Sequence, residues 1–337
     1  IQQENRGAGI ARNLGILMAS GEYVAFMDGD DFYPENDILE TLYKNAVQSK
    51  AELCGGSFSA YSNGTISYTG FRKGYVAEKE GLIKKEEYEA FGGYTRFLYS
   101  RKFLLENAIY FPDYRRFQDP PFFLNAQKKK KKVYVLRKVS YCYRKNHKLV
   151  EFDLSKSLQL MKGIRDAIRI SADYNMKKIF SLLVQELNDS LACLAYRYIA
   201  ENSQEMISVW LEIKETISSG IERFNIVESY DLLGVEEAAE FVKSIPNRKT
   251  LFLEEIRSSK HRFIYGAGVV GRKVEAFLKK NGIPIDAFVV TNKKENVKSV
   301  EEIRVEAIDD ILEYRDTALI IVATFEYLHN EIGETLK

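Results

Sequence analysis

The sequence predicts an α/β fold in three parts: an α/β domain, a helical middle region and a small C-terminal α/β domain of the Rossmann type. Strand and helix patterns alternate up to about residue 150. From Leu154 no strand pattern occurs for roughly one hundred residues, and apolar residues recur at helical spacing. Strand, glycine turn, helix and strand then follow one another from His261. We therefore divide the chain into 1–150, 151–258 and 259–337.

Composition narrows the function classes. The 337 residues are 45% hydrophobic, enough for two or three domains, and the formal net charge of +1 gives no general attraction to nucleic acid. Cys54, Cys142 and Cys193 lie too far apart for a metal-binding or CxxC motif, which indicates a reducing compartment. No apolar run is long enough to span a bilayer, so we expect a cytoplasmic protein.

Both ends of the sequence fall where a domain would be expected to continue. The chain opens on a polar loop that leads straight into a helix, and it closes within a helical pattern. We therefore expect a fragment, which lacks the first strands of its first domain and the end of its last domain.

The first elements end in a dense group of carboxylates. Helical spacing predicts a helix from Ala8 to Ser20, and the continuous apolar run from Tyr23 to Met27 predicts a strand covered on both faces, as in a parallel sheet. Asp28, Asp30 and Asp31 follow directly. Open α/β sheets bind ligands at the carboxyl ends of their strands, so we expect these acids at a ligand-binding edge.

The other elements follow in chain order. Asp119 stands at an N-cap position with Pro120 in the first turn of its helix. In the middle region, Met161, Ile164 and Ile168 mark one helical face, and Trp210, Ile213 and Ile217 mark another. The remaining predictions for the first domain are a helix at 38–47, a strand near 53, a hairpin turning at 63–64, a helix at 84–91, a strand at 92–100, a short helix at 101–108 and one or two strands at 132–148.

The acid cluster needs a positive partner, because adjacent carboxylates repel one another. A divalent cation with oxygen ligands is the natural candidate, and a diphosphate can complete its shell. In an alternative arrangement one acid binds the metal while another accepts hydrogen bonds from a sugar hydroxyl. A solvated turn is the simplest alternative, because aspartate is common in turns.

A second motif lies in the C-terminal domain. Gly266, Gly268 and Gly271 fit G-x-G-x-x-G between a strand and a helix, the setting of a dinucleotide-binding turn. However, Thr291 and Asn292 stand where an acid would meet the ribose of NAD. Binding of a nucleotide cofactor and a purely structural role, in which the glycines allow tight turning, both stay open.

The N-terminal motifs together resemble the core of a family 2 glycosyltransferase with the GT-A fold, a nucleotide-diphospho-sugar transferase domain. The matching residues are Asn5, Gly7, Ala11, Arg12, Asn13, Gly15, Gly21 to Val24 and Asp28 to Asp31. Downstream, Gln118 and Asp119 resemble the family's E-D pair, with glutamine in the first position, and "SYCYRKNHK" resembles its closing strand and loop. The likeness covers residues 1–150. The family's opening strand and its N-D-G-S motif, which help to hold the nucleotide base, are not in this sequence.

This resemblance implies a reaction. It is the inverting, metal-dependent transfer of a sugar from a nucleotide-diphosphate donor, a UDP-sugar, to a saccharide or lipid-linked acceptor in bacterial cell-surface polysaccharide synthesis. The implied cofactor is a divalent cation, Mn²⁺ or Mg²⁺. Position by position, Asp30 corresponds to a metal ligand, Asp28 to a contact with the ribose or the metal, Arg12 to a nucleotide contact and Asp31 to a donor-sugar contact.

Two further residues take roles from the same resemblance. Asp119 corresponds to the general base that removes the proton of the acceptor hydroxyl, a role compatible with capping a helix. His147 corresponds to a histidine that completes the metal site, although an exposed loop histidine is the commoner situation.

The lysine run Lys128 to Lys132 suits a solvated helix end, and it also suits attraction to an anionic bilayer or acceptor at the inner face of a membrane. Two other function classes stay open at this point. One is a nucleotide- or NAD-binding protein that acts through its C-terminal domain. The other is a non-catalytic scaffold derived from a glycosyltransferase.

Overall fold

The computed structural model describes residues 2–62, 65–67, 76–83, 88, 92–144, 152–228, 230–291, 299–300 and 302–323. The chain forms two compact units, Ile1–Ala239 and Glu240–Lys337, and each is described here by itself. The dividing point lies within the long helix α9 (Val235–Ser258). The division into three domains stays a prediction.

One mixed sheet organises the first unit, in the order β1-β5-β2-β6-β4, with β3 paired to β2. Strand β5 pairs antiparallel with both β1 and β2, whereas β2 and β6 are parallel. Strands β1, β2 and β6 therefore point the same way, and their carboxyl ends meet at one edge. The strands are β1 (Tyr23–Ala25), β2 (Leu53–Ser62), β3 (Thr65–Ser67), β4 (Gly81–Ile83), β5 (Phe97–Ser100) and β6 (Val133–Arg144).

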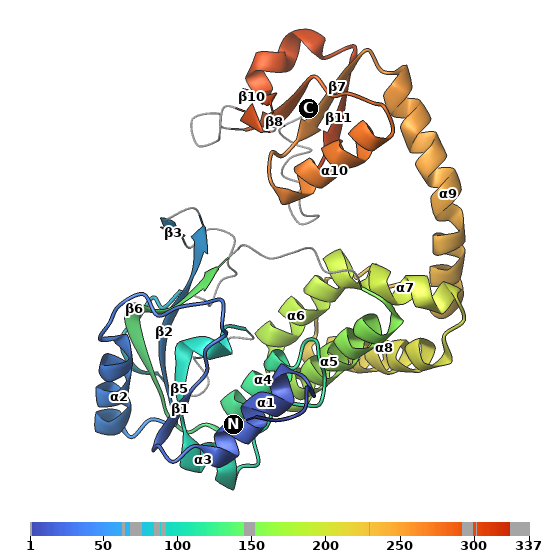
Figure 1. Ribbon diagram of the computed structural model, residues 1–337. Coiled ribbons are helices and arrows are strands. Elements are labelled where there is room, and N and C mark those ends of the chain that lie inside the picture. The colour runs from blue at the N-terminus through green and yellow to red at the C-terminus, as the bar shows by residue number, and fades with distance from the viewer. Residues whose placement is uncertain are drawn as a thin grey trace. The chain divides into compact units, whose positions relative to one another are not determined.

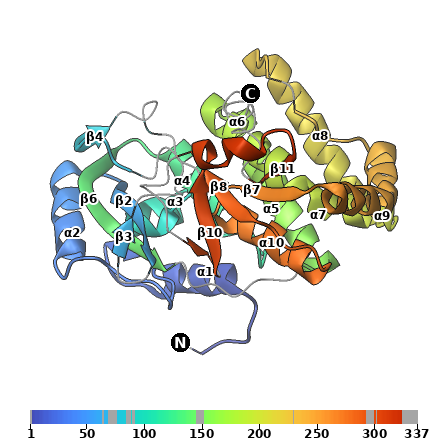
Figure 2. The same ribbon diagram turned by 90° about the horizontal axis from the view of Figure 1, so that it is seen from above.

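Helices cover both faces of this sheet (Figures 1 and 2). Helix α2 (Ile38–Ser49) packs Ile38, Leu42 and Ala46 against the sheet residues Cys54, Leu98 and Leu136. On the opposite face lie α1 (Ala8–Met18), α3 (Arg101–Glu106) and α4 (Asp119–Lys129). The helices expected at these positions are confirmed. The hairpin turn expected at 63–64 lies outside the described residues, as does the helix expected at 84–91 apart from Tyr88.

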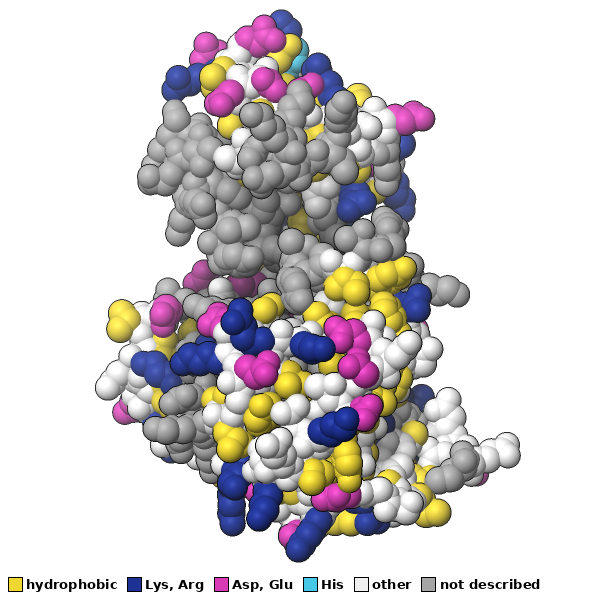
Figure 3. Space-filling model, turned by 90° about the vertical axis from the view of Figure 1, so that its left-hand side faces the viewer, with side chains coloured by type: hydrophobic (Ala, Val, Ile, Leu, Met, Phe, Trp, Pro, Cys, Tyr) yellow, Lys and Arg dark blue, Asp and Glu magenta, His cyan; other side chains and the backbone are white. Residues whose placement is uncertain are grey.

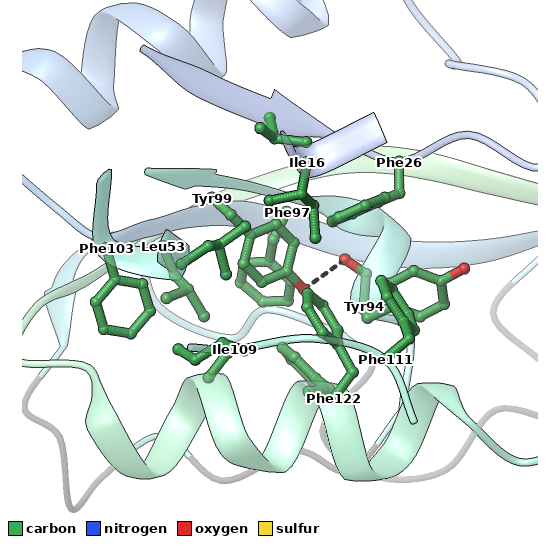
Figure 4. Close-up of a cluster of buried hydrophobic side chains, with 14 of the residues drawn as sticks. Ile16, Phe26, Leu53, Tyr94, Phe97, Tyr99, Phe103, Ile109, Phe111 and Phe122 are labelled. Carbon is green, nitrogen blue, oxygen red and sulfur yellow. Dashed lines mark hydrogen bonds between the residues drawn. The ribbon is translucent and has the colours of Figure 1, made fainter. Parts of the chain in front are cut away.

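Aromatic rings fill the core between α4 and the sheet (Figure 4). Phe111 stacks on Phe122 with the ring centroids 3.9 Å apart, and Phe26 contacts both rings edge-on. The Tyr99 hydroxyl donates a 2.8 Å hydrogen bond to the carbonyl oxygen of Tyr94. Aromatic pairs of this kind contribute about 0.5–1.5 kcal/mol beyond their buried area. The core therefore anchors Phe26 two residues before the acid cluster.

The expectation of a parallel strand covered on both faces is wrong for residues 23–27. Strand β1 contains three residues, and its described neighbour β5 is antiparallel to it. Val24 is buried, whereas Tyr23 is half-buried and Ala25 is exposed. Successive side chains of a strand point to opposite faces, so Val24 and Phe26 enter the core while Ala25 faces away from it.

The middle of the chain is helical, as predicted, and the described residues 152–228 contain no strand. Figure 1 shows these helices as a packed group. Met161, Ile164 and Ile168 on α5 are buried, as are Trp210, Ile213 and Ile217 on α8. The helices are α5 (Leu154–Asp173), α6 (Lys177–Glu186), α7 (Ala192–Ala200) and α8 (Gln204–Phe224), and a π-helical turn (Leu187–Leu191) joins α6 to α7.

The second unit contains a five-stranded sheet in the order β11-β7-β8-β10-β9. Its strands β11, β7, β8 and β10 are parallel, and α10 (Val269–Lys280) connects β7 to β8. This is the strand, turn, helix, strand order that the sequence predicts, and the α/β fold class is confirmed. The strands are β7 (His261–Tyr265), β8 (Ala287–Val290), β9 (Ser299–Val300), β10 (Ile303–Ala307) and β11 (Ala318–Val322).

Candidate active site

The acid cluster lies at the edge where β1, β2 and β6 end. A backbone bridge ties the cluster to β6: the N–H of Phe32 donates to the carbonyl oxygen of Cys142 over 3.3 Å, and the N–H of Cys142 donates back over 3.0 Å. The N–H of Asp31 also donates to the carbonyl oxygen of Asp28 over 3.1 Å, which closes a tight turn. Residues 28–31, which we call the acid loop, are therefore held in one shape against the end of β6.

Strand β6 supplies the side-chain anchors of the acid loop. The Tyr141 hydroxyl donates to Asp31 Oδ2 over 2.7 Å and accepts from the N–H of Asp28 over 3.1 Å. The N–H of Arg144 donates to Asp31 Oδ1 over 2.9 Å. Burial raises the pKa of Asp31, and the bonds from Arg144 and Tyr141 oppose that rise. Both carboxylate oxygens of Asp31 are thus used to hold the loop.

Arg12 reaches the acid loop from helix α1. Its Nη2 atom lies 2.6 Å from Asp28 Oδ1, and its guanidinium lies 5.4 Å from the ring centroid of Tyr94 and 5.5 Å from that of Phe111. The side chain is 18% exposed. Burial disfavours the charged form, but the interactions with Tyr94 and Asp28 outweigh it and raise the pKa of Arg12. The guanidinium is therefore a fixed positive charge beside the acids.

Two buried donors at this site have no hydrogen-bond partner among the described residues. They are Arg12 Nη1 and the Tyr94 hydroxyl. Burial, the largest cause, raises the pKa of Tyr94, so this hydroxyl keeps its proton. Unpaired buried polar groups are rare in folded proteins, so these two donors are candidates for contact with a bound ligand.

Asp119 begins helix α4 and does not cap it, so the N-cap expectation is wrong. Gln118 takes the N-cap position and makes no side-chain cap bond, and Pro120 and Pro121 occupy the first turn. Asp119 is half-buried. Burial raises its pKa, its own backbone N–H and the charge of Arg12 lower it, and Asp28 raises it. Arg12, Asp28 and Asp119 therefore belong to one interacting group of charges.

The described residues contain no group of three or more His, Cys, Asp or Glu side chains arranged to hold a metal ion. Asp30 is exposed in the acid loop, and His147 lies outside the described residues. The chemistry of the loop nevertheless fits a hard cation. Mg²⁺ and similar ions bind through one or two carboxylates together with substrate phosphates, and do not need a complete protein cage.

Three comparisons with known proteins bear on this site. The family model for glycosyl transferase family 2 matches residues 1–107. Residues 1–107 belong to glycosyl transferase family 2. This confirms the family to which the motifs point, and it identifies a glycosyltransferase segment in the chain.

The relatives of this glycosyltransferase are bacterial. Glycosyltransferase GlyG of Streptococcus pneumoniae is 28% identical over 225 residues, which are 60% of this chain and 72% of the relative. The uncharacterized glycosyltransferase EpsJ of Bacillus subtilis is 32% identical over 153 residues, which are 43% of this chain and 44% of EpsJ. Among solved structures, S. aureus TarS 1-349 in complex with UDP-GlcNAc has a TM-score of 0.46 and 13% identity, over 69% of this chain and 76% of TarS 1-349.

Sequence reasoning did not assign roles to two tyrosines of the glycosyltransferase site. Tyr141 carried a signal, because it stands in the "SYCYR" stretch near the end of a predicted strand. Tyr94 carried none. It reaches Arg12 because the segment before β5 lies at the same sheet edge as the end of β1, which follows from the antiparallel pairing of these strands.

The run Lys128 to Lys132 is only partly exposed to solvent. The expectation that the whole run forms a solvated helix end is therefore wrong. Helix α4 ends at Lys129, and Lys130 is 2% exposed. Lys130 Nζ donates to the carbonyl oxygens of Tyr88 and Gln127 over 3.2 and 3.3 Å. Lys128 Nζ lies 4.0 Å from the ring centroid of Tyr174. Within the run, Lys129, Lys131 and Lys132 are exposed.

The described part of the face in Figure 3 shows no large patch of a single charge. On the described part of the face in Figure 3, Lys and Arg side chains lie among Asp and Glu side chains. Across the described part of the chain, no helix combines the length and the apolar character needed to cross a bilayer.

The glycine motif of the second unit follows the carboxyl end of β7. Gly266 has a φ of +108°, which favours glycine, and Gly268 precedes helix α10. A Cβ at Gly271 would lie 1.8 Å from the carbonyl oxygen of Gly266, so only glycine fits there. The hydroxyls of Tyr265 and Thr291 are hydrogen-bonded to each other, and Asn292 lies outside the described residues.

Proposed function

We propose that the chain catalyses inverting transfer of a sugar from a nucleoside diphosphate sugar, a UDP-sugar, to a saccharide or lipid-linked acceptor in bacterial cell-surface polysaccharide synthesis. One observation carries the proposal: the guanidinium of Arg12, the acid loop and Asp119 meet at the carboxyl edge of the sheet. Two relatives support a polymeric acceptor by their names. They are the poly(ribitol-phosphate) β-N-acetylglucosaminyltransferase TarP of Staphylococcus aureus and a poly(ribitol-phosphate) β-glucosyltransferase of Bacillus spizizenii.

In this reaction Asp119 is the general base. The acceptor oxygen attacks the anomeric carbon, its proton passes to the Asp119 carboxylate, and the bond from the anomeric carbon to the phosphate oxygen breaks, which releases the nucleoside diphosphate. The pKa of Asp119 is raised by burial, which brings it closer to neutral pH and makes it a stronger base. Such a base contributes roughly 10²- to 10⁴-fold to the rate.

The other site residues bind and orient the donor. Arg12 places a positive charge beside the diphosphate and holds Asp28, which contacts the ribose or the cation. Asp31 keeps the acid loop in place and lies near the donor sugar. Asp30 would hold a divalent cation, Mn²⁺ or Mg²⁺, with His147 as a further ligand. When bound, the cation would offset the negative charge of the departing diphosphate.

A thermal-shift measurement with UDP and Mn²⁺ tests the site. We expect UDP and Mn²⁺ together to raise Tm, and the Asp30→Asn variant to lose most of the increase. Asp37→Asn is the matched control, because Asp37 is exposed and makes no side-chain cap bond. A screen of UDP-sugars for UDP release then tests turnover. The proposal fails if UDP with Mn²⁺ does not shift Tm and no donor in the screen is consumed.

A second candidate function belongs to the C-terminal unit. From β7 the chain continues to β8 on one side, whereas β11, the last described strand, lies on the other side of β7. The glycine turn of Gly266, Gly268 and Gly271 follows β7, at the point where the strand order changes direction. Parallel α/β sheets bind nucleotides at such points, so this unit is a candidate nucleotide- or NAD-binding unit. A Tm increase with NAD and none with UDP and Mn²⁺ would favour it. No increase with either would favour a non-catalytic scaffold.

The exposed lysines suggest where the enzyme works. Lys129, Lys131 and Lys132 are candidates for peripheral contact with the anionic inner face of a membrane, at about 1 kcal/mol for each residue near the surface. Co-sedimentation with phosphatidylserine vesicles at low and high salt checks this placement, and binding that does not respond to salt would contradict it.

A further inference from the structure

The segment that leads into Asp119 is held on one side by helix α1. The side-chain amide of Asn13 brackets the backbone of Phe111: Nδ2 donates to the Phe111 carbonyl oxygen over 2.8 Å, and Oδ1 accepts from the Phe111 N–H over 2.8 Å. A Cβ at Gly9 would lie 3.1 Å from the carbonyl oxygen of Pro112. Helix α1 also carries Arg12, so the same helix positions the Arg12 guanidinium and holds this segment.

Helix α5, from the helical middle region, holds the same segment on its other side. The N–H of Arg115 donates to Gln159 Oε1 over 2.7 Å, and the Tyr114 hydroxyl donates to Asp166 Oδ2 over 2.8 Å. A Cβ at Gly163 would lie 2.6 Å from the carbonyl oxygen of Phe117. Real Cβ atoms essentially never come closer than 3.0 Å to such an atom. The close approach of α5 therefore requires glycine at 163.

The backbone between these contacts and Asp119 has little freedom. Phe117 has a φ of +58°, a left-handed conformation that a bulky residue adopts only when its surroundings impose it. Gln118 is buried, and Asp119 opens a helix with prolines at its next two positions. A displacement at Phe117 is therefore transmitted to Asp119 two residues later.

We propose that Gly163 and Gln159 of helix α5 are positioning residues for Asp119, so that the helical region sets the geometry of the reaction centre. This inference rests on the proposed role of Asp119 as the base. A misplacement of about 1 Å far from the chemistry can cost about 10²-fold in rate. The hydrogen bonds of Asp28 and Asp31 in the acid loop come from Arg12 on α1 and from Tyr141 and Arg144 on β6, so we expect donor binding to change less than turnover when α5 is altered.

The substitution Gly163→Ala tests the proposal directly. The methyl group must push the Phe117 carbonyl away, which shifts Asp119 and opens its carboxylate to water. We expect a fall in kcat of at least about tenfold with an unchanged KM for the UDP-sugar. We also expect a lower titration midpoint for Asp119, measured by ¹³C NMR of aspartate-labelled protein and assigned from the Asp119→Asn spectrum.

Gly220→Ala is the matched control. Gly220 lies in α8, in the same helical region, and its added Cβ would meet the Phe180 ring at 2.3 Å without touching the segment before Asp119. It reports the effect of destabilising the helices alone. The proposal is overturned if the titration midpoint of Asp119 moves as far in Gly220→Ala as in Gly163→Ala. It is also overturned if the midpoint moves in neither variant.

A second pair of variants tests the positioning role if Gly163→Ala does not fold. Gln159→Ala removes the acceptor of the Arg115 N–H, whereas Gln159→Glu keeps an acceptor oxygen at the same place. We expect Gln159→Ala to lower kcat and the Asp119 midpoint, and Gln159→Glu to restore both. Identical behaviour of the two variants contradicts the positioning role.

The same measurements separate this inference from the proposed function. If the wild-type protein releases UDP from no donor while the Asp119 midpoint still moves in Gly163→Ala or Gln159→Ala, the sugar-transfer proposal fails and the positioning of Asp119 by α5 stands. If the wild type turns over donor and these variants match it in kcat and midpoint, sugar transfer stands and the positioning role is overturned.

Discussion

Tyr141 and Asp31 are joined by a 2.7 Å hydrogen bond in which the Tyr141 hydroxyl donates to Asp31 Oδ2. The same hydroxyl accepts the N–H of Asp28, so one side chain from the end of β6 holds both ends of the acid loop. The ring of Tyr141 stacks on Phe58 at an interplanar angle of 8°, which fixes its direction. The shape of the loop is therefore imposed by a strand more than one hundred residues further along the chain.

Replacement of Tyr141 by phenylalanine should loosen the acid loop and leave the fold intact. The variant loses the bond to Asp31 and leaves the Asp28 N–H without its acceptor. A hydrogen bond to a charged group is worth about 1.5–3 kcal/mol, so we expect the KM for the donor to rise by roughly ten- to one-hundred-fold. Tyr134→Phe is the control, because Tyr134 lies at the opposite end of β6. Equal KM values for the two variants would rule out this role.

Arg12→Lys should weaken donor binding although it keeps the charge. Lysine cannot reproduce the flat guanidinium that contacts Tyr94 and Phe111 while it bonds Asp28. We expect kcat/KM to fall by roughly ten- to one-hundred-fold. Arg6→Lys provides the comparison, because Arg6 forms an exposed pair with Asp113 at 3.8 Å. Retention of wild-type kcat/KM in Arg12→Lys would show that only the charge matters.

Asp119→Asn should remove most turnover and also change the pH dependence of stability. We expect kcat to fall by roughly 10²- to 10⁴-fold. Because the folded-state pKa of Asp119 is raised, its protonated form contributes stability that is present below the ordinary pKa and is lost as the pH rises through the folded-state value. The wild type has lost this contribution at neutral pH, whereas the asparagine variant has not.

The difference in Tm between Asp119→Asn and wild type should therefore be near zero at about pH 4, close to the ordinary aspartate pKa, and positive at about pH 8. Asp113→Asn supplies the control, because the Asp113 side chain is 65% exposed. Differential scanning fluorimetry across this range checks the sign. A difference that shrinks as the pH rises would contradict the burial of this carboxylate.

Lys130 and Lys132 should differ in their effect on stability. Lys130→Ala removes two bonds from a buried ammonium to carbonyl oxygens, and we expect the free energy of unfolding to fall by about 1.5–3 kcal/mol. Lys132→Ala changes an exposed side chain and should stay within about 0.5 kcal/mol of wild type. Urea unfolding measures both. Similar midpoints would show that the run is a uniform solvated surface after all.

Local patterns predicted much of the fold. Apolar spacing located α1, α2, α4 and the helical region, because amphipathic periodicity is a property of neighbouring residues. The same reasoning failed for residues 23–27 and for Asp119. An apolar run does not reveal whether its partner strand is parallel, and an aspartate before a proline can begin a helix as readily as cap it.

Residue patterns alone locate the chemistry: the acid loop directly after a strand, Arg12 on the helix before it, and the glycine turn after β7. Which groups meet at these places becomes visible in the folded chain. Tyr141 lies beside Asp31, Tyr94 beside Arg12, and Gly163 beside Phe117, and each pair joins residues far apart in the chain. The reason is physical: strand direction and helix packing set these contacts, and both depend on the whole sheet and its covering helices, which no short stretch of sequence encodes.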